Sequence, residues 1–150
     1  MNRETRPLTV AHRGASGLAP PNTLRAVEVA IDFGLDFIEV DVHLSRDGEL
    51  VVVHDAEVRL GGRRRAVAGL AAADLARVEL GEGQGVPRLA GVLALARGRI
   101  GVYVELKGPR TGVAMGDLVR RRGADGVRLI CGSFETALVD ELRAAAPAVP

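Results

Sequence analysis

The stretch FIEVDVHL at residues 37–44 alternates apolar and polar side chains with a period of two. In a β-strand this alternation places every apolar side chain on one face, so that the opposite face carries Glu39, Asp41 and His43. On an isolated, half-exposed strand this polar face would simply meet water. In an enclosed space, however, unpaired carboxylates are costly and require a cation or several hydrogen-bond donors.

The neighbouring segments favour the enclosed alternative. VAHRG at 10–14 precedes the stretch, and LVVVHD at 50–55 follows the segment SRDG, which is typical of a hairpin or another tight turn. The nearly continuous apolar run at 50–53 indicates a strand covered on both faces, as in a parallel sheet flanked by helices. On this interpretation His12 and His54 end the first and third strands with similar polarity.

Strand-like and helix-like patterns alternate along the rest of the chain, which predicts repeated βα units and an α/β fold. Two further strands, at 100–106 and 127–134, bring the expected number to about five. An Arg- and Gly-rich loop is expected after Asp55. Helices are expected at 24–34 (capped by Asn22 or Thr23 and closed by Gly34), 71–80, 87–96 (opened by Pro87), 115–123 (ended by Gly123) and 135–146.

Composition fits one ordinary globular core, because 47% of the 150 residues are hydrophobic. A net charge of +1 argues against an overall attraction to nucleic acid or to a membrane surface. The RRR clusters at 63–65 and 120–122 are therefore interpreted as solvated surface, with contact to a phosphate backbone as the alternative. The start, MNRETRP, lacks the apolar segment of a signal peptide, and no run is long enough to span a membrane. We expect a cytoplasmic protein.

The strand expected at 100–106 repeats the alternation of the first stretch. Its polar face carries Tyr103 and Glu105, and Lys107 continues that face. Lys107 is the only lysine in the chain, since every other basic residue is arginine. A compact ammonium group is therefore expected to be required at this point, with chance survival as the alternative. The single cysteine, Cys131, lies in an apolar strand and is expected to be an inert core thiol.

The carboxylates on the polar faces of the two alternating strands predict a metal site. If the strands lie in one parallel sheet, Glu39, Asp41 and Glu105 come from strand ends at the same edge. They could then supply oxygen ligands to a hard cation such as Ca²⁺ or Mg²⁺. Carboxylates without cysteine disfavour structural zinc.

Histidines and basic residues complete the expected site. His12 and His54 can act as a general base and a general acid near neutral pH. Arg13 and Lys107 add positive charge beside the metal. This combination suits the hydrolysis of a phosphodiester, in which one histidine activates a nucleophile and the other protonates the leaving alcohol.

Several motifs resemble those of the glycerophosphodiester phosphodiesterase family, in order and through essentially the whole chain. They are HRG at 12–14, the Pro-Asn-Thr-Leu segment at 20–24 apart from its Pro21, IEVDVHLSRDG at 38–48, VVVHD at 51–55, ELK at 105–107 and SF at 133–134. The resemblance implies a TIM (β/α)8 barrel-type fold and an enzyme that splits glycerophosphodiesters into glycerol 3-phosphate and an alcohol. A related phosphodiesterase of the lysophospholipase D or sphingomyelinase D kind is an alternative that the sequence does not discriminate.

The same resemblance implies roles for individual residues. Glu39, Asp41 and Glu105 would ligate the metal, His12 and His54 would be the acid–base pair, and Arg13 and Lys107 would hold the phosphate of a small-molecule substrate. His43 is expected at the surface of a strand end, with lining of the pocket as the alternative.

Two features depart from the family pattern. Pro21 stands where the family has the glutamate of Pro-Glu-Asn-Thr, and its presence is expected to weaken metal binding or to leave a histidine poorly oriented. A barrel of eight βα units typically needs about 250 residues. Residues 1–150 are therefore expected to form a single domain with about five βα units, truncated at its C-terminal side. Such a chain would need a missing C-terminal segment or a partner to complete the barrel, and a non-catalytic remnant that binds metal or a phosphorylated ligand is the alternative function.

Overall fold

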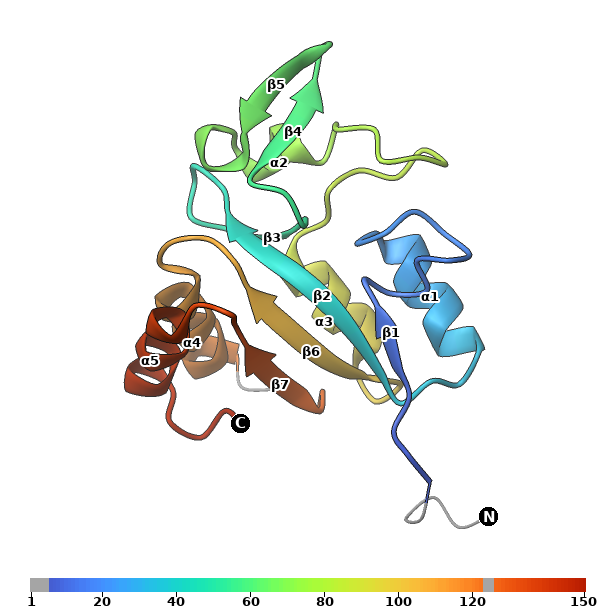
Figure 1. The fold of residues 1–150 in the computed structure, drawn as a ribbon, viewed down its shortest axis with the longest axis vertical. Helices are drawn as coiled ribbons and strands as arrows, with labels where there is room; N and C mark the ends of the chain where they lie inside the picture. Colours follow the sequence, from blue (N-terminus) through green and yellow to red (C-terminus); the bar gives the residue numbers. More distant parts are fainter. Residues whose placement is uncertain (1–5, 123–125) are drawn as a thin grey trace.

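A central sheet organises the molecule, for which the computed structural model describes residues 6–122 and 126–150 (Figure 1). Its five strands follow the order β1-β2-β6-β7, with β3 attached to β2. The strands β1 (Val10–His12), β2 (Phe37–Leu44), β6 (Gly101–Leu106) and β7 (Leu129–Gly132) run parallel to one another. The predicted α/β fold with a mainly parallel sheet is thus confirmed.

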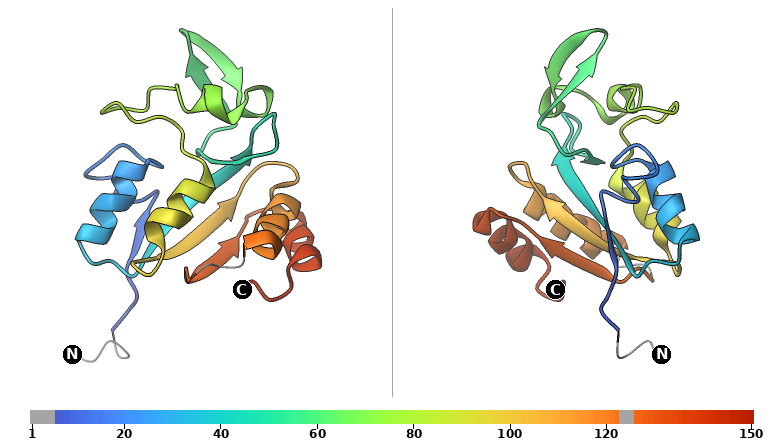
Figure 2. Two further views of the ribbon diagram at one scale, coloured as in Figure 1. Left: turned by 180° about the vertical axis from the view of Figure 1, so that it is seen from behind. Right: turned by 45° about the vertical axis from the view of Figure 1, so that its right-hand side comes forward.

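Helices cover the apolar face of this sheet. They are α1 (Leu24–Asp32), α3 (Leu89–Ala96), α4 (Thr111–Arg122) and α5 (Thr136–Ala145). Seen from behind, α3 crosses the back of β2 and β6, while α4 packs beside α5 (Figure 2). Alternate residues of β2 and β6 form the main core with these helices. That core includes Ile38, Val40, Val42, Val102, Val104, Leu106, Leu89, Val92, Met115 and Leu138.

The start of α1 is set by a side-chain cap. The Oγ1 atom of Thr23 accepts a hydrogen bond from the backbone N–H of Ala26 over 3.2 Å. This bond satisfies one of the N–H groups that the first turn of a helix leaves unpaired. Of the two expected caps, Thr23 is the one used, and Asn22 makes other contacts.

Strand β3 (Leu50–Val52) runs antiparallel to β2, so the predicted parallel direction of the third strand is wrong. The SRDG turn reverses the chain within four residues, and the N–H of Gly48 donates to the carbonyl oxygen of Ser45 over 3.0 Å. Strand β2 extends beyond the end of β1, and its last residues pair with β3. An all-apolar run is covered on both faces here because it lies between two cores, and not because its neighbours are parallel.

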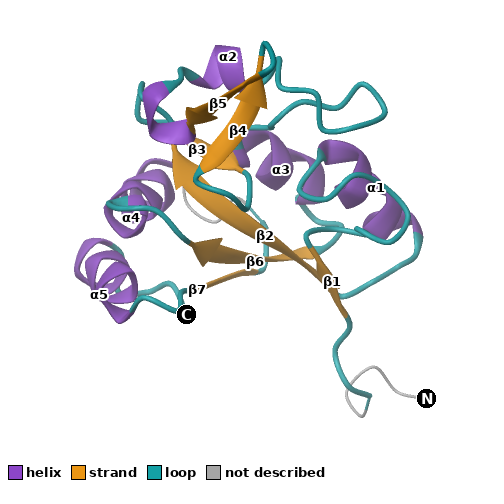
Figure 3. Cartoon of the chain, turned by 45° about the horizontal axis from the view of Figure 1, so that its top comes forward, coloured by secondary structure: helices purple, strands orange, loops and turns teal. Residues whose placement is uncertain are grey.

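A second antiparallel hairpin follows, where a loop was predicted. It consists of β4 (Glu57–Leu60) and β5 (Arg63–Ala66), and it lies beyond the carboxyl end of β2 (Figure 3). The joining residues Gly61 and Gly62 have φ values of +60° and +76°. Two successive left-handed residues are what a two-residue hairpin loop requires, and glycine adopts this conformation without strain.

Other element boundaries differ from prediction by several residues. After the short helix η2 (Val67–Gly69), helix α2 (Ala72–Leu75) is a single turn within the predicted range 71–80. The chain turns back after α2, and the N–H groups of Val78 and Val86 both donate to the carbonyl oxygen of Leu75. Helix α4 begins four residues before the predicted start at Met115. Its predicted end at Gly123 lies outside the described residues.

The predictions for two arginine clusters and for the single cysteine hold. The arginines at 63–65 and at 120–122 are exposed. Burial raises the pKa of the Cys131 thiol to about 12, so this cysteine stays protonated near neutral pH, as expected for an inert thiol. Within the described residues, none of the helices combines the length and the apolar character that a membrane span needs.

Candidate functional site

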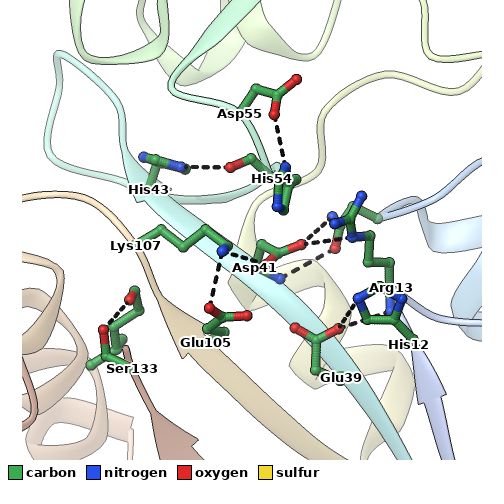
Figure 4. A network of polar contacts seen from close by, with 12 residues as sticks. His12, Arg13, Glu39, Asp41, His43, His54, Asp55, Glu105, Lys107 and Ser133 are labelled. Carbon is green, nitrogen blue, oxygen red and sulfur yellow. Dashed lines mark hydrogen bonds and ion pairs between the residues drawn. The ribbon is translucent and has the colours of Figure 1, made fainter. Parts of the chain in front are cut away.

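Three carboxylates meet on the polar face of β2 and β6 (Figure 4). Asp41 and Glu105 are paired across the two strands, and Glu39 lies two residues before Asp41 on the same face. One oxygen of each of the three carboxylates lies within 4.8 Å of the other two. Asp41 is only 1% exposed, so water screens these charges poorly. Negative charges so close together in a poorly hydrated place require cations.

Glu39 is positioned by one oxygen and unpaired at the other. The backbone N–H of Arg13 donates to Glu39 Oε2 over 2.9 Å. Glu39 Oε1 is buried and has no hydrogen-bond partner among the described residues. Burial raises the pKa of Glu39 above its usual value, although the hydrogen bond from Arg13 acts in the opposite direction. A buried carboxylate oxygen without a donor fits a ligand atom for a hard cation, since Ca²⁺ and Mg²⁺ prefer oxygen.

Two basic side chains contact different oxygens of Asp41. Arg13 Nε lies 3.4 Å from Oδ2, and Lys107 Nζ lies 3.5 Å from Oδ1. Lys107 also donates to Glu105 Oε1 over 3.0 Å. Burial alone would lower the pKa of Lys107, but the hydrogen bond with Glu105 and the charge of Asp41 outweigh it and raise that pKa. The lysine is therefore a stable cation beside the carboxylates.

His12, at the end of β1, lies beside the carboxylate cluster. Its Nε2 atom lies 3.9 Å from Glu39 Oε2. The side chain is 70% exposed, so a ligand can reach it from solvent.

His54 also lies beside the carboxylate cluster, but β3, which leads to it, is not parallel to β1 as predicted. The β2–β3 hairpin returns the chain alongside β2, where the N–H of Val53 donates to the carbonyl oxygen of Asp41 over 3.0 Å. His54 therefore follows directly beside Asp41, although β3 is antiparallel (Figure 4). Its Nδ1 lies 2.7 Å from Asp55 Oδ1, and this hydrogen bond lowers the pKa of Asp55.

A cleft adjoins the carboxylates. It has a volume of about 250 Å³ and is lined by Arg13, Pro21, Asn22, Val53, His54, Asp55 and Leu80. Because Arg13 and Asn22 both contact Asp41, the cleft opens next to the carboxylate cluster. It therefore offers a ligand one guanidinium, one imidazole, one amide, one carboxylate and an apolar wall.

Two residues near the site differ from what the sequence suggested. His43 is buried, so the expected surface position is wrong. Its Nε2 lies 3.0 Å from the carbonyl oxygen of His54, which ties the strand to the loop that carries that histidine. Asn22 was interpreted only as a possible helix cap, yet its Nδ2 donates to Asp41 Oδ2 over 2.9 Å. The position of Asn22 inside the Pro-Asn-Thr motif was the one signal that could have identified it.

Comparisons with known proteins give a consistent result. The profile of the Glycerophosphoryl diester phosphodiesterase family matches residues 12–150. YhdW of Bacillus subtilis strain 168 is 32% identical over 152 residues, which cover 94% of this chain and 63% of YhdW. The crystal structure of a glycerophosphodiester phosphodiesterase from Agrobacterium tumefaciens C58 has a TM-score of 0.84 and 34% identity, over 96% of this chain and 65% of that one.

A further solved structure is a phosphodiesterase from Oleispira antarctica in complex with the product sn-glycerol-3-phosphate. It has a TM-score of 0.85 and 27% identity, over 95% of this chain and 64% of that one. The chain thus spans just under two thirds of the length of these relatives. The likenesses confirm the predicted TIM-barrel type of fold. Of the five strands in the sheet, four belong to parallel βα units, and β3 belongs to a hairpin between β2 and α3.

Proposed function

The chain belongs to the glycerophosphoryl diester phosphodiesterase family, and on that premise we propose that it hydrolyses glycerophosphodiesters to glycerol 3-phosphate and an alcohol. The observation that carries this proposal is the cluster of Glu39, Asp41 and Glu105, whose oxygens lie within 4.8 Å of one another. The cluster adjoins a cleft that holds an arginine and a histidine. Cation ligands and phosphate-binding groups side by side are what a metal-assisted phosphodiesterase requires.

The three carboxylates are proposed to hold a divalent cation, Ca²⁺ or Mg²⁺. When bound, the cation would supply positive charge that stabilises the negative charge developing on the phosphate oxygens. Support comes from the unpaired, buried Oε1 of Glu39 and from the absence of soft ligands in the cluster. Arg13 and Lys107 would bind the substrate phosphate, the planar guanidinium of Arg13 through two parallel hydrogen bonds and Lys107 as a compact charge.

His12 and His54 are proposed as the acid–base pair. One would take a proton from the nucleophile, and the other would donate a proton to the leaving alcohol. The carboxylate of Asp55 at Nδ1 favours the tautomer of His54 in which Nε2 is free for proton transfer. His54 lines the cleft, and His12 lies at the end of β1 beside Glu39.

The presence of Pro21 removes none of the three carboxylates of the proposed cation site. All three members of the cluster come from β2 and β6, and none comes from the loop that carries residue 21. The ring of Pro21 lines the cleft together with Val53 and Leu80. Where the family pattern has a glutamate, this chain therefore presents an apolar wall.

A cytoplasmic location and the identity of the cation stay predictions.

The proposal is tested by measuring release of glycerol 3-phosphate from glycerophosphocholine, with Mg²⁺, with Ca²⁺ and with excess EDTA. We expect product only with a divalent cation, and we expect His12→Ala and His54→Ala to lower kcat by about 10²- to 10⁴-fold.

Two glutamates provide a matched pair for the same assay. Glu39→Gln removes a proposed ligand and should lower the rate and raise the cation concentration needed for activity, whereas Glu28→Gln changes an exposed carboxylate on α1 and should leave the rate unchanged. Equal product in EDTA, or an undiminished rate in His12→Ala, would disprove the proposed function.

A further inference from the structure

Two residues with a left-handed backbone conformation contact the side chain of Asp41. In the described part of the chain four residues other than glycine have a positive φ, namely Arg13, Asn22, Glu82 and Arg110. Two of them, Arg13 (φ +55°) and Asn22 (φ +59°), contact the Asp41 side chain. The N–H of Asn22 donates to the carbonyl oxygen of Arg13 over 2.9 Å, which closes the loop between them at its neck. Left-handed conformations of such residues cluster at functional sites, where the surroundings hold them in place.

Asn22 contacts Asp41 twice. Its Nδ2 donates to Asp41 Oδ2 over 2.9 Å, and its Oδ1 accepts from the backbone N–H of Asp41 over 3.3 Å. Asn22 is 4% exposed and Asp41 is 1% exposed. One buried amide group thus fixes both the main chain and the side chain of the same carboxylate residue. Hydrogen bonds shielded in this way are electrostatically stronger than exposed ones.

The second contact compensates for the early end of β1. The pairing of β1 with β2 stops at His12 and Glu39, so β1 offers no partner to the main-chain groups of Asp41. On this side of β2 the carbonyl oxygen of Asp41 accepts from Val53, and its N–H donates to Asn22. An unpaired N–H at this buried position would be costly. Asn22 therefore takes the place of a strand neighbour at the point where the site opens.

The turn before α1 holds Asn22 in the required conformation. A proline followed by a residue of positive φ is the pattern of a type II turn, and Pro21 precedes Asn22 here. The hydroxyl of Thr23 donates to the carbonyl oxygen of Pro20 over 2.6 Å and closes the same turn. Asparagine tolerates the left-handed region better than most residues, so a single residue supplies both the backbone conformation and the amide.

We propose that Asn22 is the residue that positions Asp41 in the carboxylate cluster. By engaging Oδ2 together with Arg13, it keeps Oδ1 on the side of Lys107 and Glu105. The inference rests on the proposed function in one respect, namely that the positioned carboxylate serves a bound cation. Residues that orient a metal ligand in this way typically change metal affinity by 10- to 100-fold when they are removed.

The contact itself is tested first, in protein from which divalent cations have been removed. The chain has two asparagines, Asn2 and Asn22, so selective ¹⁵N-asparagine labelling gives two side-chain NH₂ signals in an NMR spectrum. The signal lost in Asn22→Gly is that of Asn22. We expect its hydrogens to exchange with water much more slowly in the native protein than in urea. Exchange at the same rate in both states would overturn the proposal.

The effect on the cation is tested by calorimetric titration with Mg²⁺ and with Mn²⁺. Asn22→Gly is the chosen variant because glycine accepts the positive φ while both contacts disappear. We expect its Kd to be about 10- to 100-fold weaker than that of the wild type. The control, Thr23→Ala, removes the cap of α1 and the hydroxyl of the same turn without removing a contact to Asp41. It should lower the Tm and weaken Kd clearly less than Asn22→Gly does, because both contacts between Asn22 and Asp41 stay in place.

The outcomes separate the two proposals. Unchanged cation affinity in Asn22→Gly would overturn the positioning role. An equal loss of affinity in Thr23→Ala would also overturn it, because loosening the turn would then weaken cation binding without loss of the contacts to Asp41. A wild-type protein that binds neither ion would instead overturn the proposed function, and the Asn22 signals in cation-free protein would still decide whether the residue holds Asp41.

Discussion

Gly14 shows how closely the turn after β1 is packed against α1. A Cβ atom at this position would lie 2.7 Å from Ala26 Cβ and 2.9 Å from the Ala26 carbonyl carbon. Gly14 also has a φ of +73°, and its N–H donates to the carbonyl oxygen of Glu39 over 3.1 Å. The residue thus has two independent reasons to be glycine, namely backbone conformation and lack of space.

These two reasons can be separated by a pair of substitutions. Gly34→Ala introduces a side chain at a φ of +66° with no atom within 4 Å, so it should lose only about 1 kcal/mol of stability. Gly14→Ala adds a clash with backbone atoms and should be less stable than Gly34→Ala by about 1–3 kcal/mol. Urea denaturation followed by circular dichroism measures both. Equal losses would mean that the contact with Ala26 relaxes without cost.

At the scale of elements, a single carboxylate ties the entry of β1 to the loop between α1 and β2. Asp36 accepts hydrogen bonds from Arg6 Nη1 and Nη2 and from the N–H and hydroxyl of Thr9, each over 2.8 Å. The hydrogen bonds from the backbone of Thr9 and from Arg6 hold the pKa of Asp36 well below its usual value. The ionised form is therefore the one that stabilises the native state.

This lowered pKa predicts how stability depends on pH. As the pH falls below about 4, the unfolded chain takes up a proton on Asp36 before the native protein does, so stability decreases. Asp36→Asn should be less stable than the wild type at pH 7, and the difference should shrink steadily as the pH approaches 2. Urea midpoints between pH 7 and 2.5 measure this effect. Asp32→Asn, at the exposed end of α1, is the control and should run parallel to the wild type; a constant gap for Asp36→Asn would contradict the prediction.

At the scale of the whole molecule, β3 joins two hydrophobic clusters. Leu50 and Val52 belong to the main core between sheet and helices. Val51 and Val53 face the second cluster, which is formed with Val58, Val67, Leu70, Ala72, Leu75, Val78 and Val86. Since successive residues of one short strand serve both clusters, neither cluster can lose its packing without disturbing the other. We therefore propose that residues 1–150 unfold as a single domain.

Leu75→Ala tests this coupling. Leu75 is fully buried in the second cluster, and its truncation should lower the free energy of unfolding by about 2–5 kcal/mol. Tyr103, in β6 of the main sheet, is the only tyrosine, and the chain has no tryptophan, so its fluorescence reports on the main sheet alone. We expect fluorescence and far-ultraviolet circular dichroism to shift together to lower urea concentrations. A fluorescence transition that stays at the wild-type midpoint would show two independent units.

Much of the sheet could be predicted from local patterns. Alternation along β2 and β6 identified which residues share a face, because side-chain direction in a strand depends only on the parity of position. Glu39, Asp41 and Glu105 therefore emerged as one group before their distances were known. The catalytic and binding roles assigned to these residues, and to the histidines and basic side chains, stay predictions.

The direction of β3 was predicted wrongly although the SRDG turn is typical of a hairpin, because the apolar run was interpreted as a strand of a parallel sheet. An apolar run such as LVVV is buried on both faces in a parallel sheet and also between two cores, so burial alone does not give direction. The Gly61-Gly62 pair was a usable hairpin signal between two short strands, yet the charged residues around it favoured a loop. His54 lies at the site because the hairpin returns the chain alongside β2, and not because β3 runs parallel to β1.

Local periodicity determines which side chains share a face of a strand. Three-dimensional packing determines which residues from distant parts of the chain come into contact. Alternate side chains of a strand point to opposite faces because of covalent geometry. The polar face of β2 can therefore be predicted from its eight residues alone. The contact between Asn22 and Asp41 joins residues 19 positions apart and exists because β1 ends early and the following loop folds back. No period in the sequence encodes such a contact, since its energy depends on hydrogen-bonding groups that become neighbours only after the chain has folded.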